Sequence, residues 1–562
     1  MASDQDVGGS NPFMLVYVGI DAIIAYAINF YPHEFSKEWL DSASKPPVVP
    51  RTPGLGTQEQ PLPKGFTSSV SKPLKGWLDS VYDPPKGWLA SDQDVGGSNP
   101  FMLVYIRMER SSQMTSEKKK FGELTKAEMP LFIDLYELTM AQGHLDQGHN
   151  ITSSFDLSFR EMPENRGYVI VAGLEDVVEY VESISFEEEA LEFLQGMGFK
   201  KSLCEYLADF RFTGDMRAVP EGSVVFQHEP IIEITAPIVE AQILETVLIN
   251  QIGFQSLIAT KAARIYDTVQ RYGQGQSLIE FGARRAHGVE AGIKASRAAY
   301  IGGFEGTSNL AAGVMYGIPV MGTMAHSWMQ SYETEEEAFE SFIETYGEES
   351  ILLIDTYDTI TGAERVKEIV QSKGVNIKGV RLDSGDLVSL SKQVKDITGD
   401  LGIYITSGLD EYKIDQFLQD GGIATGFGVG GNLVTSREIP VAEIVYKLVQ
   451  TEENGKKTPS MKFSDGKRTY PGEKSILRIV ENGKYQKDVL ALKGEKLEGQ
   501  EQLVDIYNNG KLVYELPKLK AIQENAIESI FSLPKSCKKI ENHEPYNVEI
   551  SDGINALVET LL

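Results

Sequence analysis

EFGARRAHG, residues 280–288, joins a short apolar run to a helical pattern, and this arrangement recurs along the chain. Five further clusters rich in Gly, Arg, Asp, Ser or His follow it: GFEGTSN (303–309), GTMAHS (322–327), RLDSGD (381–386), TSGLDE (406–411) and GFGVGGN (426–432). A parallel β/α barrel carries its reactive side chains on the loops that follow its strands. The six clusters therefore predict the active-site rim of such a barrel, and with it an enzyme.

The apolar runs next to these clusters predict seven parallel strands. We expect them at 277–283, 301–306, 319–323, 350–355, 377–382, 402–406 and 424–428. Most of the gaps are long enough for the crossover helix that parallel strands need, which takes about a dozen residues or more. Seven units are one short of a complete barrel. The predicted fold class is therefore α/β, with an incomplete parallel β/α barrel.

Strand and helix patterns also lie on both sides of the barrel segment. We expect residues 115–275 to form the N-terminal part of an α+β domain and a linking helix, and residues 276–440 to form the catalytic barrel. Residues 441–562 read as the C-terminal part of the α+β domain with a helical tail. Because both flanks are rich in strands, we expect them to pair into one α+β sandwich.

Residues 1–107 do not match the rest of the chain. ASDQDVGGSNPFMLVY occurs at 2–17 and again, unchanged, at 90–105, with Pro-rich stretches between the copies. The apolar run 13–31 has about the length of a membrane helix, but no Lys or Arg precedes it as in a signal peptide. A fusion, misread upstream sequence or an extension of low order explains the segment best. We assign it no chemistry and no membrane role, and Met108 or Met114 is the natural start of the enzyme.

Composition narrows the classes of partner. The 562 residues contain 53 Lys and Arg against 81 Asp and Glu, a formal net charge of -28. Nucleic acid binding depends on basic surfaces, so nucleic acid is not an expected partner, whereas a small anionic substrate remains open. The only cysteines are Cys204 and Cys537, which exclude a disulfide framework or a Cys-rich zinc site. They are typical of a cytoplasmic protein.

Charged residues in two clusters are candidates for binding anions or sugars. Arg284 can bind phosphate or carboxylate through two hydrogen bonds, while a surface ion pair is the favoured explanation for Arg285. Asp383 stands where its strand ends, where a carboxylate can hold sugar hydroxyls or a metal. Ser384 and Asp386 are also explained as N-caps of the helix that follows.

The last two clusters and the third suggest phosphate chemistry. TSGLDE and GFGVGGN combine small residues with helix starts, so their backbone N–H groups can hold phosphate. Each alone could be an ordinary turn, but two such loops on the final strands of a barrel favour phosphate. His326 in GTMAHS is either structural or a nucleophile or proton carrier.

From about residue 120 to its C-terminus the chain resembles the nicotinate phosphoribosyltransferases, which have the type II phosphoribosyltransferase fold. The further motifs that carry the resemblance are DLYELTMAQ (134–142), FREMPENRGYVIVAGLE (159–175), GTSNLAAG (306–313) and LIDTYDT (353–359), in the same order with the rim clusters. The resemblance implies that nicotinate displaces pyrophosphate from phosphoribosyl pyrophosphate, forming nicotinate mononucleotide for NAD biosynthesis. It also implies coupling to ATP hydrolysis through a phosphohistidine, a role that falls on His326.

The resemblance also implies roles for residues around the substrates. Phe281 would stack on the pyridine ring, with Tyr136 of a second subunit on its other face, so a homodimer with shared sites is expected. Arg284, Arg381 and Asp383 would be catalytic with His326. The remaining contacts fall on Thr307, Ser308 and Ser384 for the substrate, and on Ser407, Gly408, Gly430 and Gly431 for the 5′-phosphate. Mg²⁺ would be held mainly through the substrate diphosphate, without a direct protein ligand.

Two positions limit what the resemblance implies. Related nicotinamide enzymes carry Asp where this chain has Ser308; a serine hydroxyl can donate to a carboxylate, which favours nicotinate. Many nicotinate enzymes carry Thr where Gly431 stands, so the phosphate contact there differs in detail. The alternatives are a nicotinamide phosphoribosyltransferase and a catalytically idle binding or scaffold relative.

Overall fold

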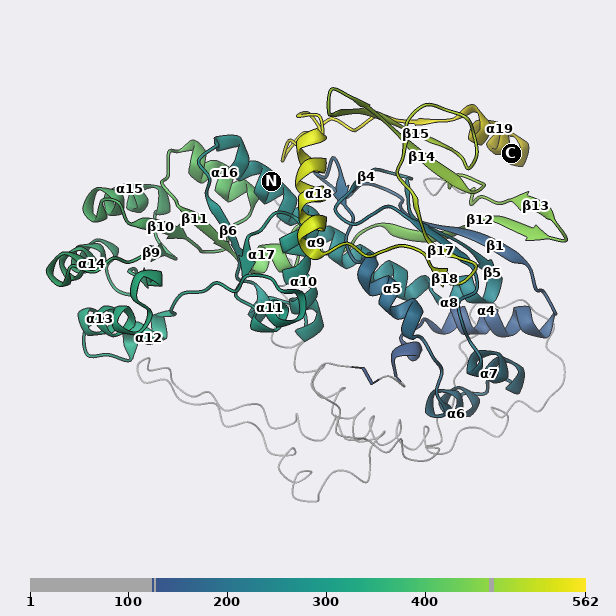
Figure 1. Ribbon diagram of the computed structural model, residues 1–562, viewed down its shortest axis with the longest axis horizontal. Coiled ribbons are helices and arrows are strands. Elements are labelled where there is room, and N and C mark those ends of the chain that lie inside the picture. Colours follow the sequence, from purple (N-terminus) through teal and green to yellow (C-terminus); the bar gives the residue numbers. More distant parts are fainter. Residues whose placement is uncertain (1–123, 126–127, 464–468) are drawn as a thin grey trace, which may run out of the picture. The chain divides into compact units, whose positions relative to one another are not determined.

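The computed structural model describes residues 124–125, 128–463 and 469–562 (Figure 1). The extension expected at 1–107, its repeat, its apolar run and both candidate start methionines lie outside the described residues. Within the described ranges, no helix combines the length and the apolar character that crossing a membrane requires.

A six-stranded parallel sheet carries the rim clusters. Its strand order is β7 (Gly306–Thr307), β6 (Ser277–Glu280), β11 (Gly426–Val429), β10 (Gly402–Ile405), β9 (Gly379–Leu382) and β8 (Ile351–Leu353). The last strand of the series, β11, pairs in parallel with the first, β6. Five of the seven predicted parallel strands are therefore confirmed. The strand predicted at 301–306 is misplaced, because Ile301 still belongs to α10 (Val289–Ile301) and β7 shares only Gly306 with the predicted range. The six observed strands pair in one mixed α/β unit.

The strand predicted at 319–323 is wrong. Only Val320 pairs there, in a single parallel bridge to Thr307, and no named strand lies between β7 and β8 in this described part of the chain. Pro319 has no N–H to donate and Gly322 has no side chain to pack, so this run cannot extend a ladder. The segment instead leads into α12 (His326–Gln330).

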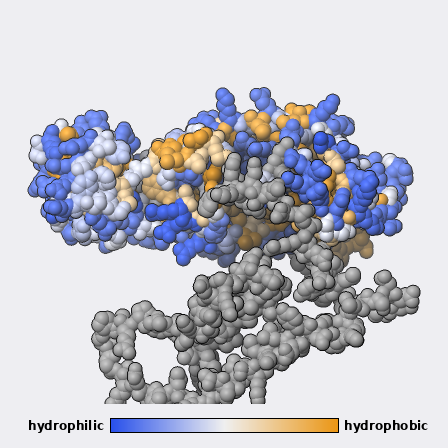
Figure 2. Space-filling view, turned by 90° about the horizontal axis from the view of Figure 1, so that it is seen from below, coloured by the Kyte–Doolittle hydropathy of each residue, from blue (hydrophilic) through white to orange (hydrophobic). Residues whose placement is uncertain are grey.

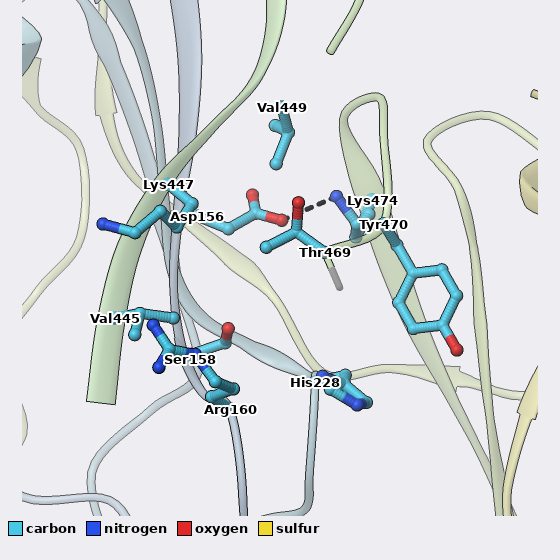
Figure 3. Close-up of a pocket in the computed structure, with 10 residues that line it drawn as sticks. All are labelled: Asp156, Ser158, Arg160, His228, Val445, Lys447, Val449, Thr469, Tyr470 and Lys474. Carbon is cyan, nitrogen blue, oxygen red and sulfur yellow. Dashed lines mark hydrogen bonds and ion pairs between the residues drawn. The ribbon is translucent and has the colours of Figure 1, made fainter. Parts of the chain in front are cut away.

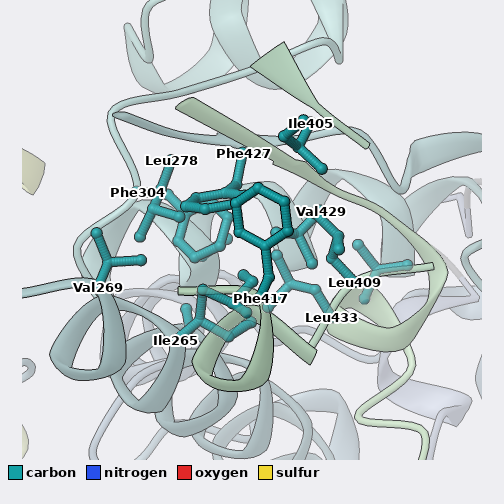
Figure 4. Close-up of a cluster of buried hydrophobic side chains, with 14 of the residues drawn as sticks. Ile265, Val269, Leu278, Phe304, Ile405, Leu409, Phe417, Phe427, Val429 and Leu433 are labelled. Carbon is teal, nitrogen blue, oxygen red and sulfur yellow. The ribbon is translucent and has the colours of Figure 1, made fainter. Parts of the chain in front are cut away.

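Helices between the strands bury the outer side of the parallel sheet. They are α10 (Val289–Ile301), α13 (Glu335–Tyr346), α14 (Thr359–Lys373), α15 (Leu387–Thr398) and α16 (Glu411–Gln419). In α16, Ile414, Phe417 and Leu418 recur at helical spacing and are buried. Phe417 meets Phe427 of β11 edge to face, with ring centroids 5.8 Å apart, inside the apolar cluster of Figure 4. This packing fixes the loops that precede α16 and follow β11.

A seven-stranded sheet unites the two flanks of the barrel segment. Its order is β13 (Lys456–Pro459), β12 (Ile444–Glu453), β1 (Thr152–Phe159), β5 (Pro230–Pro237), β3 (Asp215–Ala218), β17 (Val504–Asn508) and β18 (Lys511–Leu512). The antiparallel pairs β1–β12 and β3–β17 join early strands to late ones. A four-stranded sheet adds β16 (Gln500–Glu501), β14 (Lys474–Glu481), β15 (Lys484–Leu492) and β19 (Val548–Ile550). The expected pairing of the flanks is thus present, while the exact domain limits stay a prediction.

The linking helix α9 (Glu245–Tyr272) packs on both parts, against α10 and α16 on one side and α5 (Leu174–Ser183) and β12 on another. The other elements of the α+β part are α4 (Leu135–Asp146), β2 (Val169–Ile170), α6 (Glu188–Gly196), α7 (Lys201–Ala208), β4 (Val224–Val225), α8 (Ile238–Ile243), α18 (Leu519–Ser532) and α19 (Asp552–Leu561). Short elements complete the chain: η1 (Met129–Leu131), η2 (Ala283–Arg285), α11 (Leu310–Tyr316), η3 (Gly347–Glu349) and α17 (Gly431–Val434).

Apolar side chains are also exposed on the surface. Figure 2 shows orange residues gathered near the middle of one face, with hydrophilic residues toward both ends. Four large apolar side chains on α11 and just after it are exposed, namely Leu310, Val314, Met315 and Val320, and Val314 reaches 87 % exposure. An exposed apolar cluster of this kind is typical of a surface that contacts another molecule.

Candidate active site

Arg381, on β9, is held by hydrogen bonds on every nitrogen of its guanidinium. Its Nε donates to Thr406 Oγ1 (3.0 Å), and its Nη1 donates to Thr323 Oγ1 (2.9 Å) and to the carbonyl of Met324 (3.0 Å). Its Nη2 donates to Asp383 Oδ1 at 3.0 Å. The side chain is 14 % exposed. Partners from three neighbouring segments therefore hold its positive charge in one place.

Asp383 is kept ionised and in place by its neighbours. Burial opposes its ionisation, but the hydroxyl of Thr406 and the charge of Arg381 lower its pKa below the ordinary value. Its backbone N–H donates to Asp355 Oδ2 (2.8 Å), and Ser384 Oγ donates to the same oxygen (2.6 Å). Asp386 caps α15 by accepting from the N–H of Ser389 (3.2 Å). The capping explanation is therefore confirmed for Asp386, whereas the hydroxyl of Ser384 bonds Asp355.

His326 begins α12 and points toward Asp383. Its Nδ1 lies 3.1 Å from Thr356 Oγ1, and its Nε2 lies 3.8 Å from Asp383 Oδ2. The side chain is 41 % exposed, so solvent and ligands can reach the ring. With Nδ1 engaged by Thr356, Nε2 is the nitrogen that remains available at the rim.

Buried Glu280 connects the first two rim clusters through hydrogen bonds. Its carboxylate accepts from Thr307 Oγ1 (2.5 Å), from Ser296 Oγ (3.0 Å) and from the N–H of Gly282. Burial raises the pKa of Glu280, although these hydrogen bonds oppose the shift. Thr307 is fully buried with its hydroxyl in this cluster, while Ser308 beside it is exposed. Ser308 is therefore the solvent-accessible side chain of this pair, while Thr307 is bound to Glu280 in the interior.

The last two clusters form adjoining loops. Ser407 (φ 99°) and Gly408 (φ 61°) are consecutive residues in left-handed conformations, and for serine this costs about 1–3 kcal/mol. Asn432 ties the loops together, because its Nδ2 donates to the carbonyls of Gly408 (2.8 Å) and Leu409 (3.3 Å). Strain of this kind persists only where the surroundings enforce it, and here Asn432 contributes to the enforcement.

Gly431 adjoins the side chain of Arg285. A Cβ added to Gly431 would lie 3.0 Å from Arg285 Cδ, and Arg284 and Arg285 are both exposed on η2. Arg437 reaches the same loop through a 3.4 Å hydrogen bond from Nη1 to Asn432 Oδ1. Arginine side chains therefore stand on two sides of the second loop.

Three family models match the chain in consecutive blocks. The nicotinate phosphoribosyltransferase N-terminal domain matches residues 131–253, the family's main model matches 276–467, and its C-terminal domain matches 496–558. Over 434 residues the chain is 42 % identical to nicotinate phosphoribosyltransferase pncB2 of Mycobacterium tuberculosis, covering 75 % of this chain and 92 % of that protein. The chain belongs to the nicotinate phosphoribosyltransferase family. The resemblance seen in the motifs is thereby confirmed.

Other relatives agree with membership of the nicotinate phosphoribosyltransferase family. The nicotinate phosphoribosyltransferase of Bacillus subtilis is 36 % identical over 461 residues, covering 75 % of this chain and 93 % of that protein. The crystal structure of human nicotinic acid phosphoribosyltransferase superposes with a TM-score of 0.66 at 24 % identity, over 76 % of this chain and 99 % of that one. The latter similarity establishes a shared fold.

Tyr136 stands apart from the rim within one chain. It lies on α4, which packs against α7 and α8, and its ring is 45 % exposed. Burial raises the pKa of its hydroxyl, and the nearby negative charges of Glu245 and Glu137 raise it further. Arg381, Asp383 and His326 of the predicted site thus meet within one chain, whereas Tyr136 lies in the α+β part.

The α+β part contains a polar pocket of its own (Figure 3). Asp156, Ser158, Arg160, His228, Val445, Lys447, Val449, Thr469, Tyr470 and Lys474 line it. Lys474 Nζ is 2.6 Å from Asp156 Oδ2, and burial raises the pKa of Asp156 to about 6 although Lys474 opposes the shift. No contiguous motif marks this pocket, because its charged residues come from β1, β12, β14 and the loops that carry Arg160 and His228.

Sequence analysis also missed the residues that hold the rim in this family member. They are Asp355, Thr356, Thr323, Thr406, Asn432 and Glu280. Asp355 and Thr356 lie in the quoted motif LIDTYDT directly after β8, and this position was the available signal. The other four lie inside the quoted rim clusters, but most of the residues that they hold are far away in sequence, so the clusters do not reveal their supporting role.

Replacing Gly428 with alanine should disturb the aromatic floor of the site. A Cβ there would lie 2.5 Å from Phe281 Cδ2 and 2.7 Å from Thr406 Cγ2, so the ring must move. We expect the KM for nicotinate to rise about tenfold. The KM for phosphoribosyl pyrophosphate should rise less, because the new Cβ also displaces Thr406, which holds Arg381. Steady-state kinetics of Gly428→Ala against wild type measures both. Equal changes in the two constants would contradict a ring-specific role for Phe281.

Proposed function

We propose that this chain transfers the phosphoribosyl group of phosphoribosyl pyrophosphate to nicotinate, releasing pyrophosphate and forming nicotinate mononucleotide for NAD biosynthesis. The observation that carries the proposal is the meeting of Arg381, Asp383 and His326 at one rim in a member of this family. The bond from the anomeric carbon to the pyrophosphate oxygen breaks, and a bond to the pyridine nitrogen forms. Positive charge therefore develops on the ribose while negative charge develops on the leaving group.

Arg381 and Asp383 carry the charges that oppose, and so stabilise, these two developing charges. The anchored guanidinium of Arg381 stabilises the leaving diphosphate, because a preorganised charge needs little rearrangement during the reaction. The lowered pKa of Asp383 keeps a carboxylate beside the ribose, where it accepts from sugar hydroxyls and favours positive charge. Ser384 contributes to binding near the same sugar.

The pyridine ring and the 5′-phosphate take the remaining rim. Phe281 stacks on nicotinate, while Ser308 and Arg284 donate to its carboxylate, and Thr307 supports them from the buried side. The two tied loops present backbone N–H groups to the 5′-phosphate at Ser407, Gly408, Gly430 and Gly431.

His326 accepts the phosphoryl group that couples ATP hydrolysis to the reaction. The hydrogen bond between Nδ1 and Thr356 orients the ring and leaves Nε2 as the nucleophile. The Nε2–phosphorus bond forms as the bond from phosphorus to the leaving ADP oxygen breaks, and water later removes the phosphoryl group as phosphate. ATP is thus a co-substrate rather than a bound cofactor.

Mg²⁺ fits this site through the substrate. Among the described residues no group of three or more His, Cys, Asp or Glu side chains is arranged to hold a metal. Asp355 Oδ2 accepts from Ser384 and from the backbone of Asp383, and Asp383 Oδ1 accepts from Arg381 and Thr406, so protein groups already engage both carboxylates and the ion would be held mainly by the diphosphate. When bound, Mg²⁺ neutralises diphosphate charge.

A homodimer with shared sites completes the proposal. Tyr136 is exposed on α4 and would stack on nicotinate bound to the partner, and the exposed apolar residues of α11 offer a surface for such contact. The first strand of the series, β6, pairs with the last, β11, while β7 and β8 remain at the two edges of the sheet, and this order supports an incomplete barrel. The two isolated cysteines support a cytoplasmic enzyme.

The activity is tested by incubating the full chain with nicotinate, phosphoribosyl pyrophosphate, ATP and Mg²⁺. We expect nicotinate mononucleotide and pyrophosphate, and no product when phosphoribosyl pyrophosphate is omitted or Mg²⁺ is chelated. Competition between nicotinate and nicotinamide should favour the acid by at least about tenfold, because Ser308 donates where an aspartate would repel the carboxylate. Preference for the amide would assign the nicotinamide reaction, and absence of turnover would leave the binding or scaffold alternative.

A further inference from the structure

A buried ion cluster lies directly behind the two tied loops of the rim. It consists of Arg166, Lys261, Arg264, Glu411 and Glu438. Glu411 is the first residue of α16, three positions after Gly408, and its side chain is fully buried. Glu438 follows α17, after the second loop, and its side chain is 33 % exposed. The two carboxylates therefore belong to the segments that leave the two loops.

Lys261 and Arg166 each bind both carboxylates. Lys261 Nζ lies 2.5 Å from Glu411 Oε2 and 2.5 Å from Glu438 Oε1. Arg166 donates to Glu411 (3.3 Å) and to Glu438 (2.6 Å). Each cation thus joins the segment after the first loop to the segment after the second.

The cations come from elements outside the parallel sheet. Lys261 and Arg264 stand on α9, and Arg166 lies in the segment between β1 and β2. Arg264 Nε adds a 2.8 Å hydrogen bond to Glu411, and its Nη2 donates to the carbonyl of Ile540 (2.9 Å). Burial would raise the pKa of Glu411, but Lys261, Arg264 and Arg166 lower it to about 2. Glu411 therefore stays ionised and paired.

The ion cluster fixes the geometry of the segments that it joins. An apolar core of the same volume often stabilises a protein as well as a buried ion network does, so stability is a weak reason for this arrangement. A charged network instead fixes one geometry, because each carboxylate has few favourable positions among its cations. Here that geometry is the separation of the two loops, which Asn432 also holds from the rim side.

We propose that the ion cluster of Arg166, Lys261, Arg264, Glu411 and Glu438 positions the two loops for the 5′-phosphate of phosphoribosyl pyrophosphate. The inference rests on the proposed function, because it takes these loops as the phosphate site. The five side chains are positioning residues: they act through the loop backbones, which contact the substrate. Loss of one link should weaken phosphoribosyl pyrophosphate binding and leave nicotinate binding at Phe281 unchanged.

The experiment compares Lys261→Met and Glu438→Gln with wild type. We expect each variant to raise the KM for phosphoribosyl pyrophosphate about tenfold, with the KM for nicotinate within about twofold of wild type. Lys261→Arg, which can still reach both carboxylates, should return the former KM to within about threefold of wild type. Glu473→Gln is the matched control, since Glu473 holds Lys457 and Lys493 (2.6 and 3.0 Å) in the α+β part. It should leave both constants unchanged.

Other outcomes overturn the inference. Lower melting temperatures with unchanged KM values would assign the cluster to stability alone. If Lys261→Met weakened the binding of phosphoribosyl pyrophosphate while Glu438→Gln tightened it, the change in net charge rather than the position of the loops would explain both effects. If wild type forms no nicotinate mononucleotide, the proposed function fails by itself. Calorimetry with ribose 5-phosphate then still compares the variants without catalysis, and equal affinities across them would reject the positioning role.

Discussion

Arg381→Ala should lower kcat/KM for phosphoribosyl pyrophosphate by about two to three orders of magnitude. The guanidinium is held by Thr406, Thr323, the carbonyl of Met324 and Asp383, so its charge is fixed at the place that we propose for the leaving diphosphate. Loss of a preorganised charge costs about 10²–10³ in rate in comparable sites. Initial rates of nicotinate mononucleotide formation at varied phosphoribosyl pyrophosphate measure the loss.

Arg381→Lys should recover little of this activity, because one ammonium cannot reproduce bonds in three directions. Arg365→Ala is a suitable control: Arg365 pairs with Glu335 on neighbouring helices and should keep wild-type rates. If Arg381→Ala retained more than about a tenth of the activity while folding normally, the role assigned to Arg381 would be wrong.

His326→Ala should abolish the stimulation of the reaction by ATP. On the proposed mechanism the variant lacks the nitrogen that would accept the phosphoryl group, so the rates with and without ATP should become the same. With γ-labelled ATP, wild type should retain acid-labile label, and the variant should retain none. His149→Ala, which removes an exposed histidine of the α+β part, should behave as wild type. An ATP effect that survives in His326→Ala would refute the phosphohistidine at this position.

Thr356→Val separates orientation of the ring from its chemistry. This change removes the partner of His326 Nδ1 but keeps both ring nitrogens. Label incorporation should slow without disappearing, because the nucleophile remains and only its orientation is lost.

The sequence predicts most of the parallel strands because each apolar run ends at a cluster of Gly, polar or charged residues. β6, β9 and β10 fall inside the predicted ranges, while the run at 319–323 looks the same by composition. No strand forms at 319–323 for two reasons: Pro319 lacks an N–H, and only Val320 of this run pairs with another strand. The second reason is visible only in three dimensions. Composition cannot reveal where a sheet stops.

The rim was predictable residue by residue, and its support was not. His326, Arg381 and Asp383 are reactive side chains placed after strands, a pattern that the sequence displays. Thr406 is a common residue whose importance depends on contact with Arg381, 25 positions earlier. Thr307 shows the opposite case, because its motif suggests substrate contact whereas its hydroxyl is buried against Glu280.

The antiparallel pairing of β1 with β12 has a consequence for the order in which the protein forms on the ribosome. β1 leaves the ribosome early, but its neighbour β12 (Ile444–Glu453) is translated only after the whole catalytic segment. The parallel strands, by contrast, are complete once Val429 has been made. Domains generally fold as they emerge, so we expect the catalytic half to form while β1 and β3 still lack their outer neighbours. A translation product that stops near residue 440 would therefore carry unpaired strand edges and be prone to aggregate.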